Sequence, residues 1–405
     1  MLTTGTAVIR RFDCTSVMNY RRKRLNTSPV VAWLAGKIPN PLLRLRFLRA
    51  VMVPSPEQYR PRRSYTAWFQ VSSVVIWLLF TAPASAPWGR GANGISRPAA
   101  AASIWPTTVP VEQPPEIWQV ERTDAFETYS NGLRIDNQFS IANRRRSYLV
   151  FSATRPDDSR GERRSVPAGI VFHTTESLQA PFESGQNLAL KRIGESLLAY
   201  VRLKRSYNFV IDRFGRVYRV VLESDAANHA GSSIWSDPKW LYLNLNQSFL
   251  GVSFETQTAP GQLEAAANPA QVRSAELLIE MLRQRYGIPA GNCVTHAQVS
   301  VNVSNLLIGY HLDWASSFPF DQVGLPDNYA LPLPAISLFG FQYDLNFERK
   351  AGLRLSQEAQ LAEQVLRDNA GAAHLPVPVY RTVLQKRYSS RLAAVRGGGG
   401  IDMEE

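Results

Sequence analysis

The stretch GIVFHTTES, residues 169–177, places a histidine directly after a short apolar run. Gly-Ile-Val-Phe is partly β-branched, follows Pro167 and gives way to hydroxyl and carboxylate side chains, a pattern typical of a buried strand. A polar ring at the exit of such a strand costs free energy unless it has a partner. His173 is therefore either a hydrogen-bonded histidine of the core or a turn, or a ligand.

The basic charge of the chain is confined to its beginning. The net charge of the 405 residues is +12, but residues 1–86 hold thirteen Lys and Arg residues against only Asp13 and Glu57. The remainder is nearly neutral, which disfavours a nucleic-acid-binding body. The two cysteines, Cys14 and Cys293, give no disulfide framework, and Cys293 is expected to pack rather than react.

Residues 1–86 resemble a leader. A basic cluster precedes an uncharged segment, residues 64–89, whose densely apolar part spans only residues 74–80 and is followed by small residues. This order predicts a signal peptide cleaved after Ala84, with Met52 as the true start. An uncleaved N-terminal anchor, and so membrane attachment, is the alternative, although the apolar part is short for a span of about 20 residues. We expect an exported protein of the periplasm or cell envelope.

The rest of the chain alternates strand and helix patterns. A helix over residues 185–203, with an apolar face that includes Leu188, precedes a hairpin over 206–221 that turns at 213–215. A strand over 248–255 and an amphipathic helix over 269–286 follow. This order predicts an α/β fold with a mixed central β-sheet flanked by helices.

The flanking segments differ in character from this central part. We expect a linker with short β segments over 87–145, a catalytic domain over 146–330, and a C-terminal extension over 331–405. The extension is first Pro-rich and irregular, then helical over 356–368 and 379–395, and ends in a disordered tail. Residues 157–165 are expected to form a charged loop.

Four of the five histidines lie between residues 169 and 313, and the fifth, His374, is expected at the surface. His173 and His296 both end short apolar pieces, and His311 lies close to Asp313. Two histidines and a carboxylate are the ligands of many catalytic zinc sites, which keep the fourth position open.

Several motifs occur here in one characteristic order. The strand that ends in His173 is followed by YNFVID, NHAG, LGVSFE, a helix, THA and HLDWASSF. This order resembles the zinc-dependent N-acetylmuramoyl-L-alanine amidases, of the amidase type 2 and peptidoglycan recognition protein fold, over about residues 165–320. The resemblance implies Zn²⁺ as cofactor and peptidoglycan or muropeptides as substrate.

The resemblance also implies the ligands. His173 and His296 match the two histidine ligands of the family, and Asp313 matches the third, with Phe318 as the apolar residue after it. Trp314 and the alanine after it replace the Pro-Gly of the family motif. An alternative has His311 as the ligand and Asp313 behind it.

Candidate catalytic residues follow from the same resemblance. Tyr207 matches a tyrosine whose hydroxyl faces the water on the metal, and His311 lies where the family carries an oxyanion-stabilising side chain. Glu255 is a general-base candidate, although the family glutamate lies two residues earlier, at Ser253 of this chain. Glu176, three residues after His173, could act on a ligand or on water.

Candidate substrate-binding residues are His229 and Asn228 of NHAG and Thr174, with His229 matching a histidine of the substrate groove. The resulting hypothesis is zinc-dependent hydrolysis of the amide between N-acetylmuramic acid and L-alanine in cell-wall turnover or remodelling. Two alternatives stay open: a non-catalytic peptidoglycan-binding module, and a zinc peptidase or amidase acting on another exported amide.

Overall fold

The computed structural model describes residues 116–257 and 266–397. The chain divides into two units, residues 1–96 and 97–405, and all described residues belong to the second. The predicted leader, the first part of the predicted linker and the predicted disordered tail from residue 398 on lie outside the described residues. Within the described ranges, no helix is both long and apolar enough to cross a membrane.

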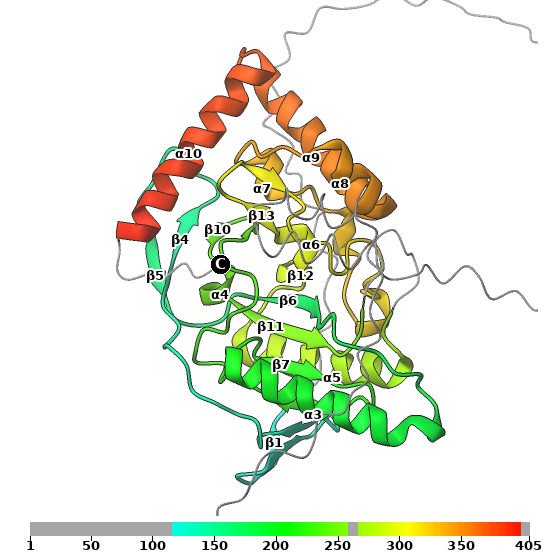
Figure 1. The fold of residues 1–405 in the computed structure, drawn as a ribbon. Coiled ribbons are helices and arrows are strands. Elements are labelled where there is room, and N and C mark those ends of the chain that lie inside the picture. The colour runs from blue at the N-terminus through cyan, green and yellow to red at the C-terminus, as the bar shows by residue number, and fades with distance from the viewer. Residues whose placement is uncertain (1–115, 258–265, 398–405) are drawn as a thin grey trace, which may run out of the picture. The chain divides into compact units, whose positions relative to one another are not determined.

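An eight-stranded mixed sheet organises this unit (Figure 1). Its strands run β1-β2-β3-β8-β7-β11-β6-β12 across the sheet, with parallel pairing of β6 to both β11 and β12. The bounds are β1 Gln119–Arg122, β2 Phe126–Tyr129, β3 Arg134–Asp136, β6 Gly169–Thr174, β7 Phe209–Ile211, β8 Val217–Arg219, β11 Phe249–Phe254 and β12 Cys293–Thr295. The predicted mixed sheet flanked by helices is therefore confirmed.

Helix α5, Pro269–Tyr286, covers one face of this sheet and has the bounds that the sequence predicts. Asn268 caps it in a reciprocal capping box with Gln271, and Gly287 ends it in the left-handed conformation. Its apolar side packs on Ile170 and Phe172 of β6, among other residues. Because side chains alternate along a strand, His173 faces the opposite side of the sheet.

Helix α3, Asn187–Lys204, packs on that opposite side through Leu197 and Val201, together with Val210 of the sheet. Leu188 does not join this face, as the sequence pattern had suggested, but is 63% exposed. Leu188 precedes Leu197 by nine residues, and an α-helix turns by about 100° per residue, so Leu188 lies on the far side of the helix from Leu197.

A second, antiparallel sheet has the order β5-β4-β10-β9, with β4 Tyr148–Ser152, β5 Glu162–Arg164, β9 Ile234–Ser236 and β10 Trp240–Leu243. β5 lies inside residues 157–165, so the prediction of a simple charged loop there was wrong. Its arginines and glutamate pair with β4 at the exposed edge of the sheet, where charged side chains are compatible with a strand.

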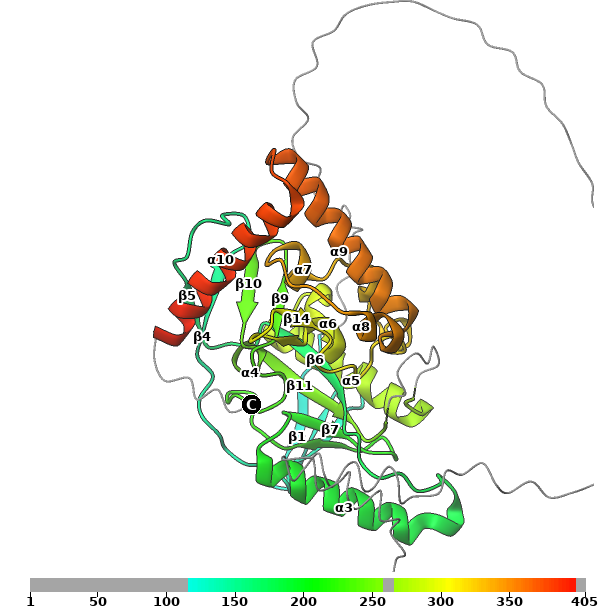
Figure 2. The same cartoon turned by 45° about the horizontal axis from the view of Figure 1, so that its top comes forward.

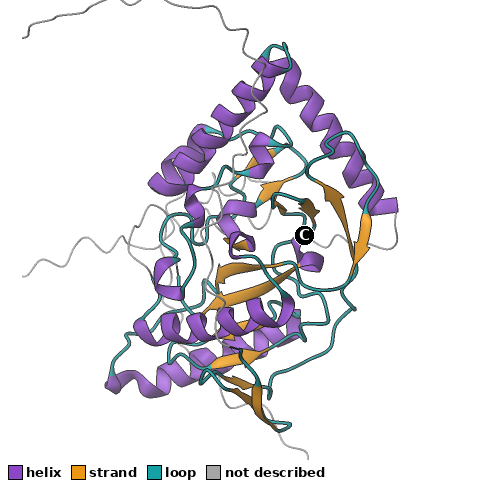
Figure 3. Cartoon of the chain, turned by 180° about the vertical axis from the view of Figure 1, so that it is seen from behind, coloured by secondary structure: helices purple, strands orange, loops and turns teal. Residues whose placement is uncertain are grey.

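The C-terminal helices share a core with this second sheet. α9, Gly352–Ala372, and α10, Val377–Gly397, diverge from a tight turn, as Figures 1 and 2 show and Figure 3 shows from behind. Leu355 of α9 and Leu384 of α10 lie in one hydrophobic cluster with Phe151 of β4. His374, in the turn between them, is exposed as expected. The domain boundaries at 145 and 330 stay predictions, but both flanks pack on the central unit.

Short elements complete the described chain. They are η2 Ser184–Gln186, α4 Leu245–Ser248, η3 Ala290–Asn292, α6 His296–Val299, β13 Val301–Asn302, β14 Leu307–Ile308, η4 Asp321–Val323, η5 Asn328–Ala330, α7 Pro334–Ser337 and α8 Leu345–Lys350. The Pro-rich segment over residues 325–341 contains two of these short helices, η5 and α7, and its residues Ile336, Phe339 and Phe341 are fully buried.

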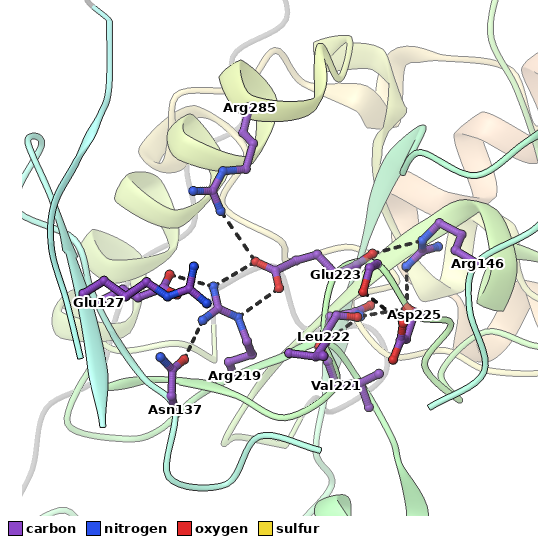
Figure 4. A network of polar contacts seen from close by, with 12 residues as sticks. Glu127, Asn137, Arg146, Arg219, Val221, Leu222, Glu223, Asp225 and Arg285 are labelled. Carbon is purple, nitrogen blue, oxygen red and sulfur yellow. Dashed lines mark hydrogen bonds and ion pairs between the residues drawn. The ribbon is translucent and has the colours of Figure 1, made fainter. Parts of the chain in front are cut away.

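A buried ionic network joins the N-terminal strands to the hairpin (Figure 4). The Arg219 guanidinium donates to both carboxylate oxygens of Glu223 at 2.9 Å and to Glu127 at 3.0 Å, and it also reaches Asn137. The Nη1 atom of Arg285 in α5 lies 3.9 Å from Oε1 of Glu223. Arg219, Glu127 and Glu223 are buried, so each of these charges depends on its partners to replace the hydration it has lost.

Replacing Arg219 with Met should lower the free energy of unfolding by about 3–5 kcal/mol, because two buried carboxylates would lose their cation. Arg273→Met on α5 is the matched control: its pair with Glu276 is exposed and should contribute about 0–1 kcal/mol. Denaturant unfolding of both variants measures the difference. Equal effects of the two substitutions would contradict a stabilising role for the buried network.

Candidate active site

Three side chains that the sequence singles out converge at one point. The Nδ1 of His173 lies 3.2 Å from Oδ2 of Asp313, and the Nδ1 of His296 lies 2.9 Å from Oδ1 of the same carboxylate. One potential ligand atom from each residue lies within 4.8 Å of the others. In the described part of the chain, this is the only such group of three or more His, Cys, Asp or Glu residues.

Two neighbouring strands present the histidines. His173 is the fifth residue of β6 and lies beside Ser253 of β11. β12 pairs with the other edge of β6, placing Thr295 beside Phe172, and His296 follows at once as the first residue of α6. Thr295 caps α6 in a capping box with Gln298, which fixes the direction in which the chain leaves the strand.

Asp313 comes from a loop that is anchored on both sides. Its carbonyl oxygen accepts a hydrogen bond from the amide of Ala297 at 3.2 Å. The next residue, Trp314, has a left-handed backbone (φ 58°) and a fully buried indole that contacts Phe254 and Phe318 edge to face. Trp314 therefore supplies a tight turn and a buried anchor where the family motif has Pro-Gly.

Phe318 and Tyr329 hold the other end of this loop. Phe318 stacks on Phe172, the residue before His173, with ring centroids 4.2 Å apart. The Tyr329 hydroxyl donates to the carbonyl of Trp314 at 2.5 Å and accepts from the amide of Phe318 at 3.1 Å. The apolar match at Phe318 thus has a structural reason: it connects the loop of Asp313 to the strand of His173.

The protonation states of the group suit a metal ion. Burial, together with the nearby His296, lowers the pKa of His173 to about 4, so its imidazole is neutral at pH 7. Burial alone would raise the pKa of Asp313, but His296 and His173 outweigh it and hold that pKa well below the usual range. The site therefore offers a neutral imidazole nitrogen next to a carboxylate anion.

Tyr207 and Ser253 lie beside this group. The Tyr207 ring centroid is 5.1 Å from that of His173, and its backbone is left-handed (φ 59°). Burial, with the charge of Asp313, raises the pKa of Tyr207, so the hydroxyl stays protonated at neutral pH. Ser253 is fully buried, and its side chain is too short to replace the family glutamate as a base.

His311 lies on the solvent side of His296. Its ring stacks on that of His296 with centroids 4.4 Å apart and an interplanar angle of 20°, and Tyr310 contacts it edge to face. The backbone amide of His311 donates to Ser300 at 2.8 Å. His311 is not a member of the convergent group, which instead contains Asp313.

The two glutamates occupy different places. Glu255 lies two residues beyond Ser253, about 6–7 Å further along the strand direction. Its carboxylate accepts from the backbone amide of Arg213 at 3.1 Å and lies near Gly194 of α3. Glu176 is exposed in the turn after β6 and accepts a hydrogen bond from Thr174 at 2.5 Å. The structure thus brings neither glutamate into the convergent group.

The predicted substrate-binding residues are not gathered in one place. Asn228 is exposed, and its side-chain amide donates to the carbonyl oxygen of Lys204 at the end of α3. Thr174 is buried, and its hydroxyl donates a hydrogen bond to the carboxylate of Glu176. His229 lies behind His173, with its Nδ1 3.1 Å from the Nε2 of that histidine. His229 thus lies where it can hydrogen-bond a candidate metal ligand, whereas the sequence resemblance implied a contact with substrate in the groove.

The sequence reasoning missed the residues that support His229. Asn246 accepts hydrogen bonds from three successive backbone amides of the NHAG loop, and Gly251 of β11 leaves room for the His229 ring. The glycine of LGVSFE was visible as part of a motif, but no sequence signal marked Asn246. Cys293 is buried, which raises the pKa of its thiol to about 12, so it packs as expected.

Tyr329→Phe should lower the free energy of unfolding by about 1–3 kcal/mol, because the Trp314 carbonyl and the Phe318 amide lose a buried hydrogen-bond partner. Tyr200→Phe on α3, where the side chain is 58% exposed, is the control and should change the free energy by less than about 0.5 kcal/mol. Chemical denaturation measures both. An unchanged Tyr329→Phe variant would mean that the hydroxyl does not hold the loop.

The amidase type 2 family model, described as N-acetylmuramoyl-L-alanine amidase, matches residues 163–306, which include His173, Tyr207, His229 and His296. Asp313 lies seven residues beyond the matched segment. No curated protein sequence matches the chain.

Solved structures with similarity to the chain include three amidases. The amidase LysC of Clostridium intestinale is 18% identical, with 45% of this chain and 93% of that chain covered and a TM-score of 0.25. The amidase AmiD of E. coli, in complex with anhydro-N-acetylmuramic acid-L-Ala-D-gamma-Glu-L-Lys, is 20% identical, with coverages of 58% and 91% and a TM-score of 0.31. AmpDH3 of Pseudomonas aeruginosa, in complex with anhydromuramic pentapeptide, is 17% identical, with coverages of 57% and 92% and a TM-score of 0.30.

The family match covers β6, β12 and α6, which present the two histidines of the convergent group. By this match, residues 163–306 of the chain are similar to the amidase type 2 family of N-acetylmuramoyl-L-alanine amidases.

Proposed function

We propose that this protein is a zinc-dependent hydrolase that cleaves the amide between N-acetylmuramic acid and L-alanine in peptidoglycan or muropeptides. The observation that carries the proposal is the meeting of the Nδ1 atoms of His173 and His296 on the carboxylate of Asp313. The match of residues 163–306 to the N-acetylmuramoyl-L-alanine amidase family supports the substrate class.

The donors of this group fit zinc. Imidazole nitrogen and carboxylate oxygen are ordinary zinc ligands, and three protein ligands leave a position open for water or substrate. Bound zinc would polarise the amide carbonyl and lower the pKa of a coordinated water to about 7. The preference for zinc over the harder cations Mg²⁺ and Ca²⁺ follows from the two imidazoles, because those cations prefer oxygen ligands.

Tyr207 and His311 are the proposed contributors to the chemistry. Because its pKa is raised, Tyr207 acts as a neutral hydroxyl that orients the attacking water rather than as a phenolate base. His311 lies on the open side of His296, where a ring N–H could donate to the developing oxyanion.

The remaining role in the proposed chemistry is that of the general base. Ser253 occupies the family position, and Glu255 points toward Gly194 of α3. Glu176 is exposed in the turn after His173, and its charge contributes to the raised pKa of Tyr207, so it acts within electrostatic reach of that hydroxyl. Of the two glutamates, we assign the role of base to Glu176.

The proposed location is the cell envelope. The basic and apolar order of residues 52–86 supports export, and a peptidoglycan substrate would lie outside the cytoplasm. Residues 146–330 are proposed as the catalytic domain. Either a cleaved leader or an uncleaved anchor would bring this domain to its substrate.

His173→Ala should abolish both zinc binding and amidase activity, because it removes one of three ligands. We would measure zinc per chain by elemental analysis and release of peptide stems from purified sacculi, using the full-length chain. His374→Ala, at an exposed position outside the site, is the control and should keep both.

Each outcome of this experiment decides between functions. Stoichiometric zinc with peptide release, both lost only in His173→Ala, supports the hydrolase. Zinc without release from sacculi or from muropeptides would point to another exported amide substrate. Sacculus binding without zinc or release would establish a recognition module and contradict the catalytic proposal.

Tyr207→Phe should lower kcat about 10²-fold with zinc content unchanged, because the variant keeps the ring but loses the group that orients water. Tyr200→Phe serves again as the control, since its hydroxyl is at an exposed position on α3. Steady-state kinetics on a soluble muropeptide would separate kcat from KM. A variant with the wild-type kcat would remove Tyr207 from the mechanism.

A further inference from the structure

A chain of hydrogen bonds leads from the backbone of β11 to the convergent group. The Nε2 of His229 lies 3.3 Å from the carbonyl oxygen of Phe249, and its Nδ1 lies 3.1 Å from the Nε2 of His173. The Nδ1 of His173 then faces Asp313 at 3.2 Å. The two imidazoles thus stand in series between a main-chain carbonyl and the carboxylate.

The carbonyl determines where the protons lie. The oxygen of Phe249 can only accept, so the Nε2 of His229 must carry the proton of that hydrogen bond. In a neutral imidazole the Nδ1 of His229 is then an acceptor, and the Nε2 of His173 must donate to it. It follows that the Nδ1 of His173 is unprotonated and presents its lone pair toward Asp313.

A lone pair that faces a carboxylate oxygen at 3.2 Å is repelled unless a cation lies between them. The opposite arrangement would put a proton on the Nδ1 of His173, but it would leave the Nε2 of His229 without a proton against a carbonyl oxygen. The hydrogen-bond chain therefore favours the arrangement that suits a metal ligand.

The fold holds the His229 ring in this position from two sides. A Cβ at Gly251 would come within 2.7 Å of the Cγ of His229, so the ring rests in a hollow that only glycine leaves in β11. The side-chain oxygen of Asn246 accepts from the backbone amides of His229, Ala230 and Gly231 at 2.7–2.8 Å. Both the ring and its backbone are thus held in place.

The carbonyl group of Phe249, where this series of hydrogen bonds begins, is itself held in place. The buried guanidinium of Arg146 donates to the oxygen of Phe249 at 2.9 Å and to that of Gln247 at 2.6 Å, and it also reaches the carbonyl oxygens of Glu223 and Asp225. Figure 4 shows Arg146 against Asp225 and Glu223. The acceptor for His229 therefore has a defined position.

From these contacts we infer that His229 is a positioning residue, which fixes the tautomer of His173 with its proton on Nε2 and its lone pair on Nδ1. The inference concerns the ligand atoms and rests on the proposed function only in taking zinc as the metal. It gives His229 a role behind the metal site in place of the predicted contact with substrate.

The test is the tautomer of His173 in the metal-free, full-length chain, labelled with ¹⁵N in its five histidines. Ring ¹⁵N chemical shifts distinguish a protonated from an unprotonated nitrogen, and His173→Ala assigns the signal. Wild type should show the proton on Nε2. His229→Leu, which fills the space with an apolar side chain but removes the Nδ1 acceptor, should shift His173 toward a mixture of tautomers.

Zinc affinity, measured by competition with a chelator, is the second readout and should weaken about 10–100-fold in His229→Leu. His229→Asn is the conservative variant, because its side-chain oxygen lies near the position of Nδ1 and can accept from His173; it should keep most of the affinity. Gly251→Ala, which displaces the ring without removing it, should behave like His229→Leu. His374→Asn controls for the loss of a histidine.

The outcomes separate this inference from the proposed function. A His229→Leu variant that folds and keeps both the Nε2 tautomer and the zinc affinity would overturn the inference. Equal losses in the Asn and Leu variants would also overturn it, because they would show a need for the ring itself and not for its acceptor. Wild-type zinc binding with the expected tautomers but no amidase activity would contradict the proposed function alone.

Discussion

The site depends on one arrangement that costs free energy: a buried carboxylate held between two imidazoles at the carboxyl end of a buried strand. Asp313 has lost most of its hydration, so its negative charge needs a hydrogen-bond donor or a cation between it and the nitrogens of His173 and His296 that face it. Parallel pairing of β6 with β12 brings the two histidines to the same edge of the sheet. The third partner must then arrive from a loop, which explains why so many contacts serve to hold that loop.

Rigidity around the site comes from packing on both faces of the sheet. α5 covers Phe172 on one side, and Phe318 extends this contact to the loop of Asp313. On the other side, the hollow at Gly251 admits a polar ring where an apolar side chain would otherwise fill the space. The same strand pair thus provides a packed core and a polar cavity, because its side chains alternate between the two faces.

The sequence was informative where the cause of a structure is local. The capping residues and apolar period of α5 predicted its bounds, and the strand ends predicted His173 and His296 as close neighbours. The position of His229 could not be predicted in this way, because it depends on the pairing of β11 with β6 and on Asn246 in the short helix α4. β5 was missed for a related reason: its charged side chains lie at an exposed edge, so no apolar alternation marks it as a strand.

The segments outside the family match also support the site. Gln298, which completes the cap of α6 next to His296, donates to the Glu358 carboxyl of α9 at 2.6 Å and to the carbonyl of Asn328 at 3.0 Å. Glu358 is fully buried, and burial raises its pKa well above the usual range, so it is held as the neutral acid. A neutral carboxyl costs far less free energy at this depth than a carboxylate would. The C-terminal extension therefore contacts the element that carries a proposed ligand, and its packing acts on the geometry of the site through Gln298.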